Sequence, residues 1–219
     1  MTKTSSDEAV ARFDTQAAAE KYARALPGTG TDRRERRCLT RALAGVRVGA
    51  EVLDLPCGTG RLLPLLCGLG YKVTGADSSA HMVEQARQYA ALQGLPLGAD
   101  RFFVANILRT PFGDAAFDAV VCNRLFHHFR ESEVRRAALR ELRRLSKGPI
   151  VVSFFRNLGW GAFTFHLKRW LSRSEPKDRI PIRLATFQAD IEAAGLRLVR
   201  TWAVRPLVSK NWYVLLVRA

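Results

Sequence analysis

A glycine-rich turn between an apolar strand and a helix is the clearest chemical signal in this sequence. The run VLDLPCGTGRLLPLL starts at Val52, and Gly58 and Gly60 directly follow its apolar first part. Glycine lets the backbone take positive φ and approach a ligand closely, and open α/β sheets bind ligands where their strands end. The turn therefore indicates a cofactor site, although Leu63 stands where a dinucleotide fingerprint has its third glycine.

An acidic residue at the end of the next strand narrows the cofactor class. Asp77 follows the strand-like run KVTGA and stands 17 residues after Gly60. A carboxylate at this place can accept hydrogen bonds from both hydroxyls of a ribose. The turn and Asp77 together predict an adenosine-type cofactor. Each has a plainer alternative when taken singly, since a glycine turn can serve packing alone and an aspartate can cap a helix.

Alternating strands and helices must position these residues. Apolar strands are predicted at 51–55, 72–76, 101–105, 117–122 and 149–155. Helices are predicted at 7–25, 32–46, 61–69, 79–92 and 132–145, with Asp32 as the N-cap of the second. Continuous apolar strands alternating with helices indicate an α/β fold, in which a parallel sheet carries helices on both faces.

The C-terminal part departs from this alternation. After a helix at 186–194, two β-rich runs at 196–204 and 211–218 are joined only by the loop RPLVSK. A parallel crossover needs about a dozen residues, so these two runs should pair antiparallel. We therefore expect a mostly parallel, seven-stranded sheet with one antiparallel strand.

Three blocks of the sequence resemble the class I S-adenosylmethionine-dependent methyltransferases. The blocks are VLDLPCGTGR, VTGADSSAHMVEQAR and RFFVANILRTPFGDAAFDAVVCNRLFHH; with the closing strands, the resemblance covers about residues 50–155 and 186–218. It implies a Rossmann-like fold, S-adenosyl-L-methionine as the cofactor, and methyl transfer as the activity. The first block departs from the family's pattern at Pro56, where the family usually has glycine.

The resemblance also implies residue roles. Asp54 would lie near the amino group of the cofactor's methionine part, and Asp77 would bind the ribose. Asn123 would contact the methionyl part through its backbone. The remaining expected cofactor contacts are Pro56, Cys57, Gly58 and Gly60 in the turn, Ser78 and Met82 beside the adenosine, and Ala105, Asn106 and Ile107 at the edge of the adenine.

Histidines after the fourth predicted strand are candidates for a catalytic base. His127 and His128 lie in the FHHF segment, where an acceptor should meet the cofactor. Histidine can take a proton from a hydroxyl near neutral pH, although either ring could instead only shape the pocket. His166 is a weaker candidate within an aromatic run. The NPPY-like motif of enzymes that methylate exocyclic amines is absent, which favours O-methylation of a small-molecule or lipid- or glycan-linked acceptor.

The positive charge is concentrated in one part of the sequence. The chain of 219 residues has a formal net charge of +15, and residues 124–183 hold 15 basic and five acidic side chains. Such a field attracts anions, so an anionic acceptor is expected. Peripheral contact with an anionic membrane or glycolipid is also consistent with it, and nucleic acid is a less favoured partner. Charged helix faces in water would give the same count.

We expect a helical lid at 1–48 and a methyltransferase core at 49–219, with a basic, aromatic insert at 156–185 that includes Trp160 and Trp170. No apolar run of 18 residues, signal segment or CxxC pair occurs, which predicts a cytoplasmic protein without a transmembrane segment or metal site. The alternatives are an RNA-directed methyltransferase, a nicotinamide-dependent oxidoreductase, and a non-catalytic basic binding module that kept the fold.

Overall fold

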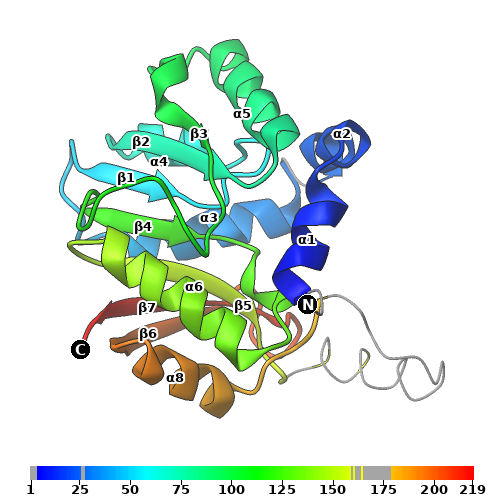
Figure 1. Cartoon of the computed structure of the whole chain (residues 1–219), viewed down its shortest axis with the longest axis vertical. Coiled ribbons are helices and arrows are strands. Elements are labelled where there is room, and N and C mark those ends of the chain that lie inside the picture. Colours follow the sequence, from blue (N-terminus) through cyan, green and yellow to red (C-terminus); the bar gives the residue numbers. More distant parts are fainter. Residues whose placement is uncertain (1–3, 26–27, 159, 161–163, 165–178) are drawn as a thin grey trace.

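A single mixed sheet organises the part of the chain that the computed structural model describes, namely residues 4–25, 28–158, 160, 164 and 179–219. Its strand order is β3-β2-β1-β4-β5-β7-β6 (Figure 1). β7 is antiparallel to β5 and β6, whereas β1 to β5 pair in parallel. The predicted sheet is therefore confirmed. The strands are β1 Glu51–Asp54, β2 Lys72–Asp77, β3 Phe102–Val104, β4 Ala119–Cys122, β5 Ile150–Phe155, β6 Leu196–Ala203 and β7 Asn211–Arg218.

The strand order reverses beside β1. Val52 of β1 pairs with Val73 of β2 on one side and with Ala119 of β4 on the other. The chain therefore builds outward from β1 to β3 and then returns to add β4 on the opposite edge. The loops that follow β1 and β4 leave in opposite directions at such a point, and a crevice opens between them.

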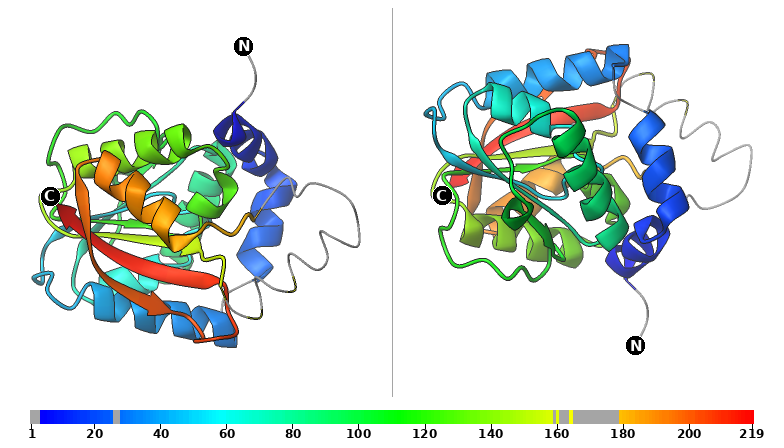
Figure 2. Two further views of the ribbon diagram at one scale, coloured as in Figure 1. Left: turned by 90° about the horizontal axis from the view of Figure 1, so that it is seen from below. Right: turned by 90° about the horizontal axis from the view of Figure 1, so that it is seen from above.

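Helices cover both faces of the sheet (Figure 2). On one face, α3, α4 and α5 pack over a buried cluster that includes Leu39, Leu66 and Ala86. On the other face, α6 and α8 pack over a cluster that includes Leu142 and Phe187. The helices are α1 Ser5–Phe13, α2 Gln16–Ala25, α3 Gly30–Ala42, α4 Leu63–Gly68, α5 Ala80–Leu92, α6 Ser132–Leu145 and α8 Leu184–Ala193, with short 3-10 helices η1 Ala99–Arg101 and η2 Phe126–His128.

The first predicted helix is wrong in one respect. Residues 7–25 form two helices, α1 and α2, which meet at Asp14 and Thr15. The Thr15 hydroxyl accepts a hydrogen bond from the Ala18 N–H at 3.2 Å and so starts the second helix. Short polar side chains compete with helical hydrogen bonds in this way, and the apolar spacing of the sequence does not report it.

The expected N-cap of α3 is also wrong. Thr29 caps this helix, because its side chain accepts a hydrogen bond from the Asp32 N–H at 3.1 Å. Asp32 lies in the first turn, buried, with its carboxylate paired to Arg36 and Arg61. A residue that resembles a cap in the sequence is thus used in a tertiary ion pair.

The first two helices lie beside the carboxyl ends of the strands (Figure 1). α1 is fastened there by Arg130, whose backbone N–H donates to the Ser5 hydroxyl at 3.0 Å and whose guanidinium pairs with Glu8 at 2.9 Å. α3 instead packs on the sheet with Cys38 and Leu39 in the core. The helical lid at 1–48 stays a prediction. Of its helices, α1 and α2 lie beside the carboxyl ends of the strands, where a lid would be needed.

Much of the basic insert lies outside the described residues, including His166 and Trp170 and the aromatic helix expected there. The described part includes Arg156, whose guanidinium lies 4.4 Å from the Trp212 ring centre, and Trp160, which is exposed. Within the described ranges, no helix combines the length and apolar character needed to cross a bilayer.

Packing of α6 against the sheet should contribute strongly to stability. Leu142 is fully buried in the cluster beneath this helix, while Arg140 on the same helix is exposed. We expect Leu142→Ala to lower the free energy of unfolding by about 2–5 kcal/mol, since it removes apolar contacts and leaves a cavity. Arg140→Ala should change it by less than about 0.5 kcal/mol. Urea unfolding measures both, and equal effects would contradict this account of the core.

Candidate functional site

One pocket lies at the crevice between β1 and β4. It encloses about 980 Å³ of empty space, including the part open to solvent. Residues that follow β1, β2, β3 and β4 form its inner wall, and α1 and α2 form its outer wall. All predicted site residues line it except Asp54, Gly60 and His127; those that do are Pro56, Cys57, Gly58, Asp77, Ser78, Met82, Ala105, Asn106, Ile107, Asn123 and His128.

The two positions of the turn require glycine for different structural reasons. Gly60 has φ +81°, and a Cβ there would lie 3.1 Å from Ala86 Cα and 2.8 Å from Leu63 Cδ1. Gly60 therefore allows the turn to pack against α5. Gly58 has φ +54°, and a Cβ there would meet no atom within 4 Å. Since Gly58 lines the pocket, its missing side chain leaves room that a ligand can fill.

Pro56 and Cys57 complete the turn without offering a nucleophile. The Leu55–Pro56 peptide bond is cis, a form that proline tolerates far better than other residues. The Cys57 N–H donates to the Ala76 carbonyl at 2.8 Å, which joins the turn to β2. Burial, together with the neighbouring carboxylates of Asp77 and Asp54, raises the pKa of the Cys57 thiol well above its usual value, so this cysteine stays protonated.

Asp54 ends β1 and directly precedes Leu55, which lines the pocket. Its side chain is fully buried, and neither carboxylate oxygen has a hydrogen-bond partner. Burial raises the pKa of Asp54 to about 8, with the Asp77 carboxylate adding to the rise and Arg61 opposing it. A buried polar group without a partner is costly, and a cationic donor beside this carboxyl would remove that cost.

Asp77 is held rigidly at the end of β2. One oxygen accepts from the Gly58 N–H at 2.9 Å and the other from the Ser79 N–H at 3.0 Å. Burial nevertheless raises the pKa of Asp77, while these backbone N–H groups oppose the rise. Each oxygen has a second lone pair, so the carboxylate can still accept from two hydroxyls.

The segment after β3 borders the same pocket. The Ala105 N–H donates to the Asp77 carbonyl at 2.8 Å, which extends the pairing of β3 with β2 beyond the strand. Ala105 and Ile107 are buried, whereas Asn106 is exposed and its side-chain oxygen accepts from the Leu108 N–H at 2.9 Å. The Asn106 side-chain oxygen therefore stabilises its own turn.

Asn123 follows β4 and is buried. Its side-chain oxygen accepts a hydrogen bond from the Tyr213 hydroxyl of β7 at 2.8 Å. This bond crosses from β7 to the end of β4 and fixes the Asn123 backbone at the pocket wall. Tyr213 gives no such indication in the sequence, because it lies in the apolar β7 run.

The two candidate histidines have ring centres 4.1 Å apart, but their other neighbours differ. His128 lines the pocket, and its ring lies 5.2 Å from the Phe13 ring centre in an edge-to-face arrangement. His127 stacks on Phe155 with ring centres 4.0 Å apart and 6° between the planes. Burial, assisted by His128 and nearby cationic side chains, lowers the pKa of His127 well below 6.5, so this ring is neutral near pH 7.

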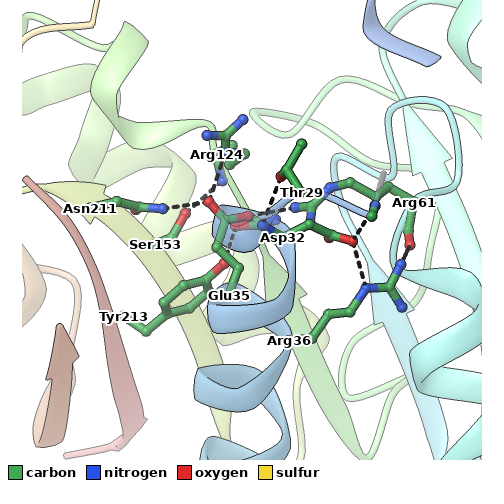
Figure 3. Close-up of polar contacts among 11 residues, drawn as sticks. Thr29, Asp32, Glu35, Arg36, Arg61, Arg124, Ser153, Asn211 and Tyr213 are labelled. Atoms are coloured by element: carbon green, nitrogen blue, oxygen red, sulfur yellow. Dashed lines mark hydrogen bonds and ion pairs between the residues drawn. The ribbon is translucent and has the colours of Figure 1, made fainter. Parts of the chain in front are cut away.

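A buried ion-pair network adjoins the pocket (Figure 3). The guanidinium of Arg61, just after the glycine turn, pairs with Asp32 and, at 2.8 Å, with Glu35, both on α3. Glu35 is fully buried and also pairs with Arg124 at 3.2 Å. Sequence reasoning did not assign Arg61 or Arg124 to the site, although both line the pocket.

The sequence likewise did not indicate which aromatic residues line the pocket. Phe13 of α1 and Tyr22 of α2 meet edge to face at 5.4 Å between ring centres, and both line the cavity. Apolar positions in an N-terminal helix resemble ordinary core positions in the sequence. Within the described residues, no group of three or more His, Cys, Asp or Glu side chains is placed to hold a metal ion.

Comparison with known proteins agrees with this geometry. Residues 52–148 match the family described as "Methyltransferase domain". A demethylmenaquinone methyltransferase of Thermus thermophilus is 36% identical over 138 residues, which are 61% of this chain and 60% of that protein. The O-methyltransferase cnsE of Penicillium expansum is 35% identical over 112 residues, 48% of this chain and 40% of that protein. This chain thus spans less than two thirds of either relative.

Solved structures show the same fold. The magnesium protoporphyrin IX methyltransferase of Synechocystis PCC 6803, solved with bound SAM, has a TM-score of 0.73 at 20% identity and covers 100% of this chain and 99% of its own. Its structure with bound SAH has a TM-score of 0.75, also at 20% identity, over 98% of this chain and 100% of its own. This chain thus contains a region similar to the methyltransferase domain family, within a fold that it shares with an S-adenosylmethionine-bound methyltransferase.

Proposed function

We propose that this protein transfers the methyl group of S-adenosylmethionine to an oxygen atom of a flat, largely apolar small molecule. The observation that carries the proposal is the pocket between the strand ends and the helices α1 and α2. It joins the turn residue Gly58 and the carboxylate of Asp77 to an aromatic wall that contains His128. A cofactor and an acceptor would therefore share one enclosed space.

The residues of the inner wall fit the cofactor chemically. Asp54 offers a buried, unpartnered carboxyl for the ammonium group of the methionine part. Asp77 offers a fixed carboxylate for the ribose hydroxyls, and Gly58 leaves the space in which the ligand would lie. Ser78, Met82 and the segment from Ala105 to Ile107 supply the border for the adenine ring.

The chain's own contribution to the reaction is alignment and proton removal. When bound, S-adenosylmethionine supplies an electrophilic methyl group on a sulfonium. A wall fixed by the Tyr213–Asn123 hydrogen bond and the Arg61 ion pairs holds the reacting groups in register, which lowers the entropic cost of reaction. His128 is the residue that we assign as general base, because its ring lines the pocket.

The aromatic wall supports a flat, apolar acceptor. Phe13, Tyr22 and Phe129 line the pocket together with Leu125 and Val10. Aromatic side chains favour ring-shaped ligands through stacked and edge-to-face contacts. Relatives named for O-methylation and for quinone methylation support the same class. The alternative acceptor is a lipid- or glycan-linked molecule. The basic insert would then supply a contact with the surface that carries it.

Turnover with labelled cofactor tests the proposed function. Purified protein would be incubated with methyl-labelled S-adenosylmethionine and separate small-molecule, lipid and RNA fractions of a cell extract. Label in the small-molecule or lipid fraction, released by chemistry typical of methyl ethers or esters, supports the proposal. Label in RNA alone would support an RNA-directed methyltransferase. Binding without any turnover would support a non-catalytic module.

The two glycines of the turn should separate binding from stability. Gly58→Ala places a methyl group in the pocket, and we expect it to weaken S-adenosylhomocysteine binding at least about tenfold at a stability cost of about 1–2 kcal/mol. Gly60→Ala should cost more stability, about 2–4 kcal/mol, because the Ala86 backbone must move. Calorimetric titration and urea unfolding measure the two effects. Unchanged affinity in Gly58→Ala would contradict the assigned position of the cofactor.

Asp54 should make stability depend on pH. Its pKa is raised to about 8 in the folded protein, so between pH 4 and pH 8 the unfolded chain loses this proton while the folded chain keeps it. The free energy of unfolding should therefore fall as pH rises, by about 1–3 kcal/mol more between pH 5 and 7 in wild type than in Asp54→Asn. Equal slopes in the two proteins would contradict this.

The same carboxyl should release a proton when an ammonium group binds beside it. Near pH 7, titration of wild type with S-adenosylhomocysteine should release up to one proton, seen as a binding heat that depends on the ionisation heat of the buffer. Asp54→Asn should bind without this release. A buffer-independent heat in wild type would show that Asp54 does not meet the ammonium group.

The two histidines should differ in their effect on turnover. His128→Gln removes the proposed base, so we expect kcat to fall about 100-fold or more, with S-adenosylhomocysteine affinity within about threefold of wild type. His127→Phe preserves the stacking on Phe155 and should keep most of the turnover. The base assignment would be wrong if His127→Phe lost as much turnover as His128→Gln.

A further inference from the structure

Arg124 occupies an unusual backbone position at the pocket. It is the second residue after β4 and has φ +61°, in the left-handed region. Non-glycine residues rarely take this conformation, and it costs free energy that the surroundings must supply. Here the Arg124 N–H donates to the Ser153 hydroxyl of β5 at 2.6 Å, which holds the strained residue in place. The fold thus presents this side chain at a defined point of the wall.

The charges around Arg124 do not balance. The network joins three guanidinium groups, those of Arg36, Arg61 and Arg124, to only two carboxylates, those of Asp32 and Glu35. Asp32 pairs with Arg36 and Arg61, and Glu35 is shared between Arg61 and Arg124. Among the described residues, one positive charge is therefore left without its own counter-ion at the pocket wall.

The geometry assigns that excess charge to Arg124. Both terminal nitrogens of Arg61 are occupied, one by Asp32 and the other by Glu35. Arg124 approaches Glu35 only through Nε, at 3.2 Å, and its terminal nitrogens point away from this carboxylate (Figure 3). Glu35 is the only ion-pair partner of Arg124 among the described residues. Since 22% of its side chain is exposed and Arg124 lines the pocket, the guanidinium fork faces the ligand space.

We propose that Arg124 binds a carboxylate group of a ligand held in this pocket. The guanidinium fork is suited to a carboxylate because two parallel N–H groups match its two oxygens. Two sources of this group lie within the proposed function, on which the inference rests: the methionyl carboxylate of the cofactor and a carboxylate on an acidic acceptor. In the second case Arg124 determines specificity, and the acceptor class narrows to aromatic or similarly flat acids.

Two nucleosides test the first source. S-adenosylhomocysteine carries the amino-acid carboxylate, whereas 5′-methylthioadenosine has the same adenosine and a thioether without it. Both would be titrated calorimetrically into wild type and Arg124→Gln. If Arg124 holds the methionyl carboxylate, Arg124→Gln weakens S-adenosylhomocysteine at least about tenfold and leaves 5′-methylthioadenosine within about twofold.

Two aromatic probes test the second source. Protein saturated with S-adenosylhomocysteine would be titrated with 4-hydroxybenzoate and with its methyl ester, which differ in the carboxylate charge. If Arg124 binds an acidic acceptor, wild type prefers the acid at least about tenfold, and Arg124→Gln removes the preference without changing S-adenosylhomocysteine affinity.

Arg36→Gln is the matched control. Arg36 also pairs with a carboxylate of α3, and its side chain is 25% exposed against 22% for Arg124, but Arg36 does not line the pocket. Arg36→Gln should leave unchanged the affinity ratio between the two nucleosides and the affinity ratio between 4-hydroxybenzoate and its methyl ester. Arg124→Lys keeps the positive charge but not the guanidinium fork, so it should lose part of the affinity for the carboxylate ligand. This variant provides the test if Arg124→Gln does not fold.

The inference is overturned if folded Arg124→Gln retains the wild-type affinity for S-adenosylhomocysteine and wild type shows no preference for the benzoate. It is also overturned if both nucleosides weaken equally, because general damage to the pocket then explains the result. Wild type that binds neither nucleoside would instead defeat the proposed function, and the benzoate comparison on the unliganded protein would still test Arg124.

Discussion

The guanidinium of Arg61, buried between two carboxylates, joins the parts of the protein that must not move independently. Arg61 follows the glycine turn, whereas Asp32 and Glu35 belong to α3, which packs on the sheet. Burying charges is costly, and a pair of this kind is stable only when every partner is in place. The backbone is tied to the network as well, since Arg36 donates to the Arg61 carbonyl at 2.7 Å. The glycine turn is therefore fixed on one side by the ion pairs with α3 and on the other side by the sheet.

The same network reaches the far wall of the pocket. Glu35 accepts from Asn211 of β7 at 2.8 Å and pairs with Arg124 after β4. Tyr213 of β7, three strands away from β1 in the sheet, holds Asn123 in the same region. α3, β4 and β7 are distant in the sequence, yet one set of polar contacts fixes their relative positions. The pocket wall is in this sense preorganised, and a ligand does not have to assemble it.

Rigid support contrasts with the groups that the fold leaves without partners. The carboxyl of Asp54 is buried and unpaired, and the space at Gly58 is empty of protein atoms. The unpaired carboxyl costs free energy in the folded chain alone, and the proposed ligand would supply its partner and fill the space at Gly58. Arg124 is a further position that costs free energy, through its left-handed conformation, although its Nε pairs with Glu35. Gly58 and Arg124 border the cavity itself, and Asp54 directly precedes its lining residue Leu55, so these positions lie where the proposed ligand would bind.

The sequence by itself was sufficient for the fold and for most of the inner wall. The alternation of apolar runs identified the five parallel strands, because buried parallel strands have a continuous apolar signature that depends only on neighbours in the chain. The antiparallel pair β6 and β7 was recognisable from two β-rich runs joined by a short loop. Gly58 and Asp77 were also recognisable, since the turn and the strand end are local features with a fixed spacing. The break at Asp14 and Thr15 and the true cap at Thr29 were missed, because short polar residues have several local uses and the spacing does not choose among them.

Only the tertiary structure decided which polar side chains share the pocket. His127 and His128 are adjacent and equivalent in the sequence, but the short helix η2 directs one ring onto Phe155 and the other to the pocket wall. Asp32, Glu35, Arg61 and Arg124 were four charges among many until packing enclosed them in one network. The physical reason is that burial and pairing set the properties of a charged group, and both depend on residues far away in the chain.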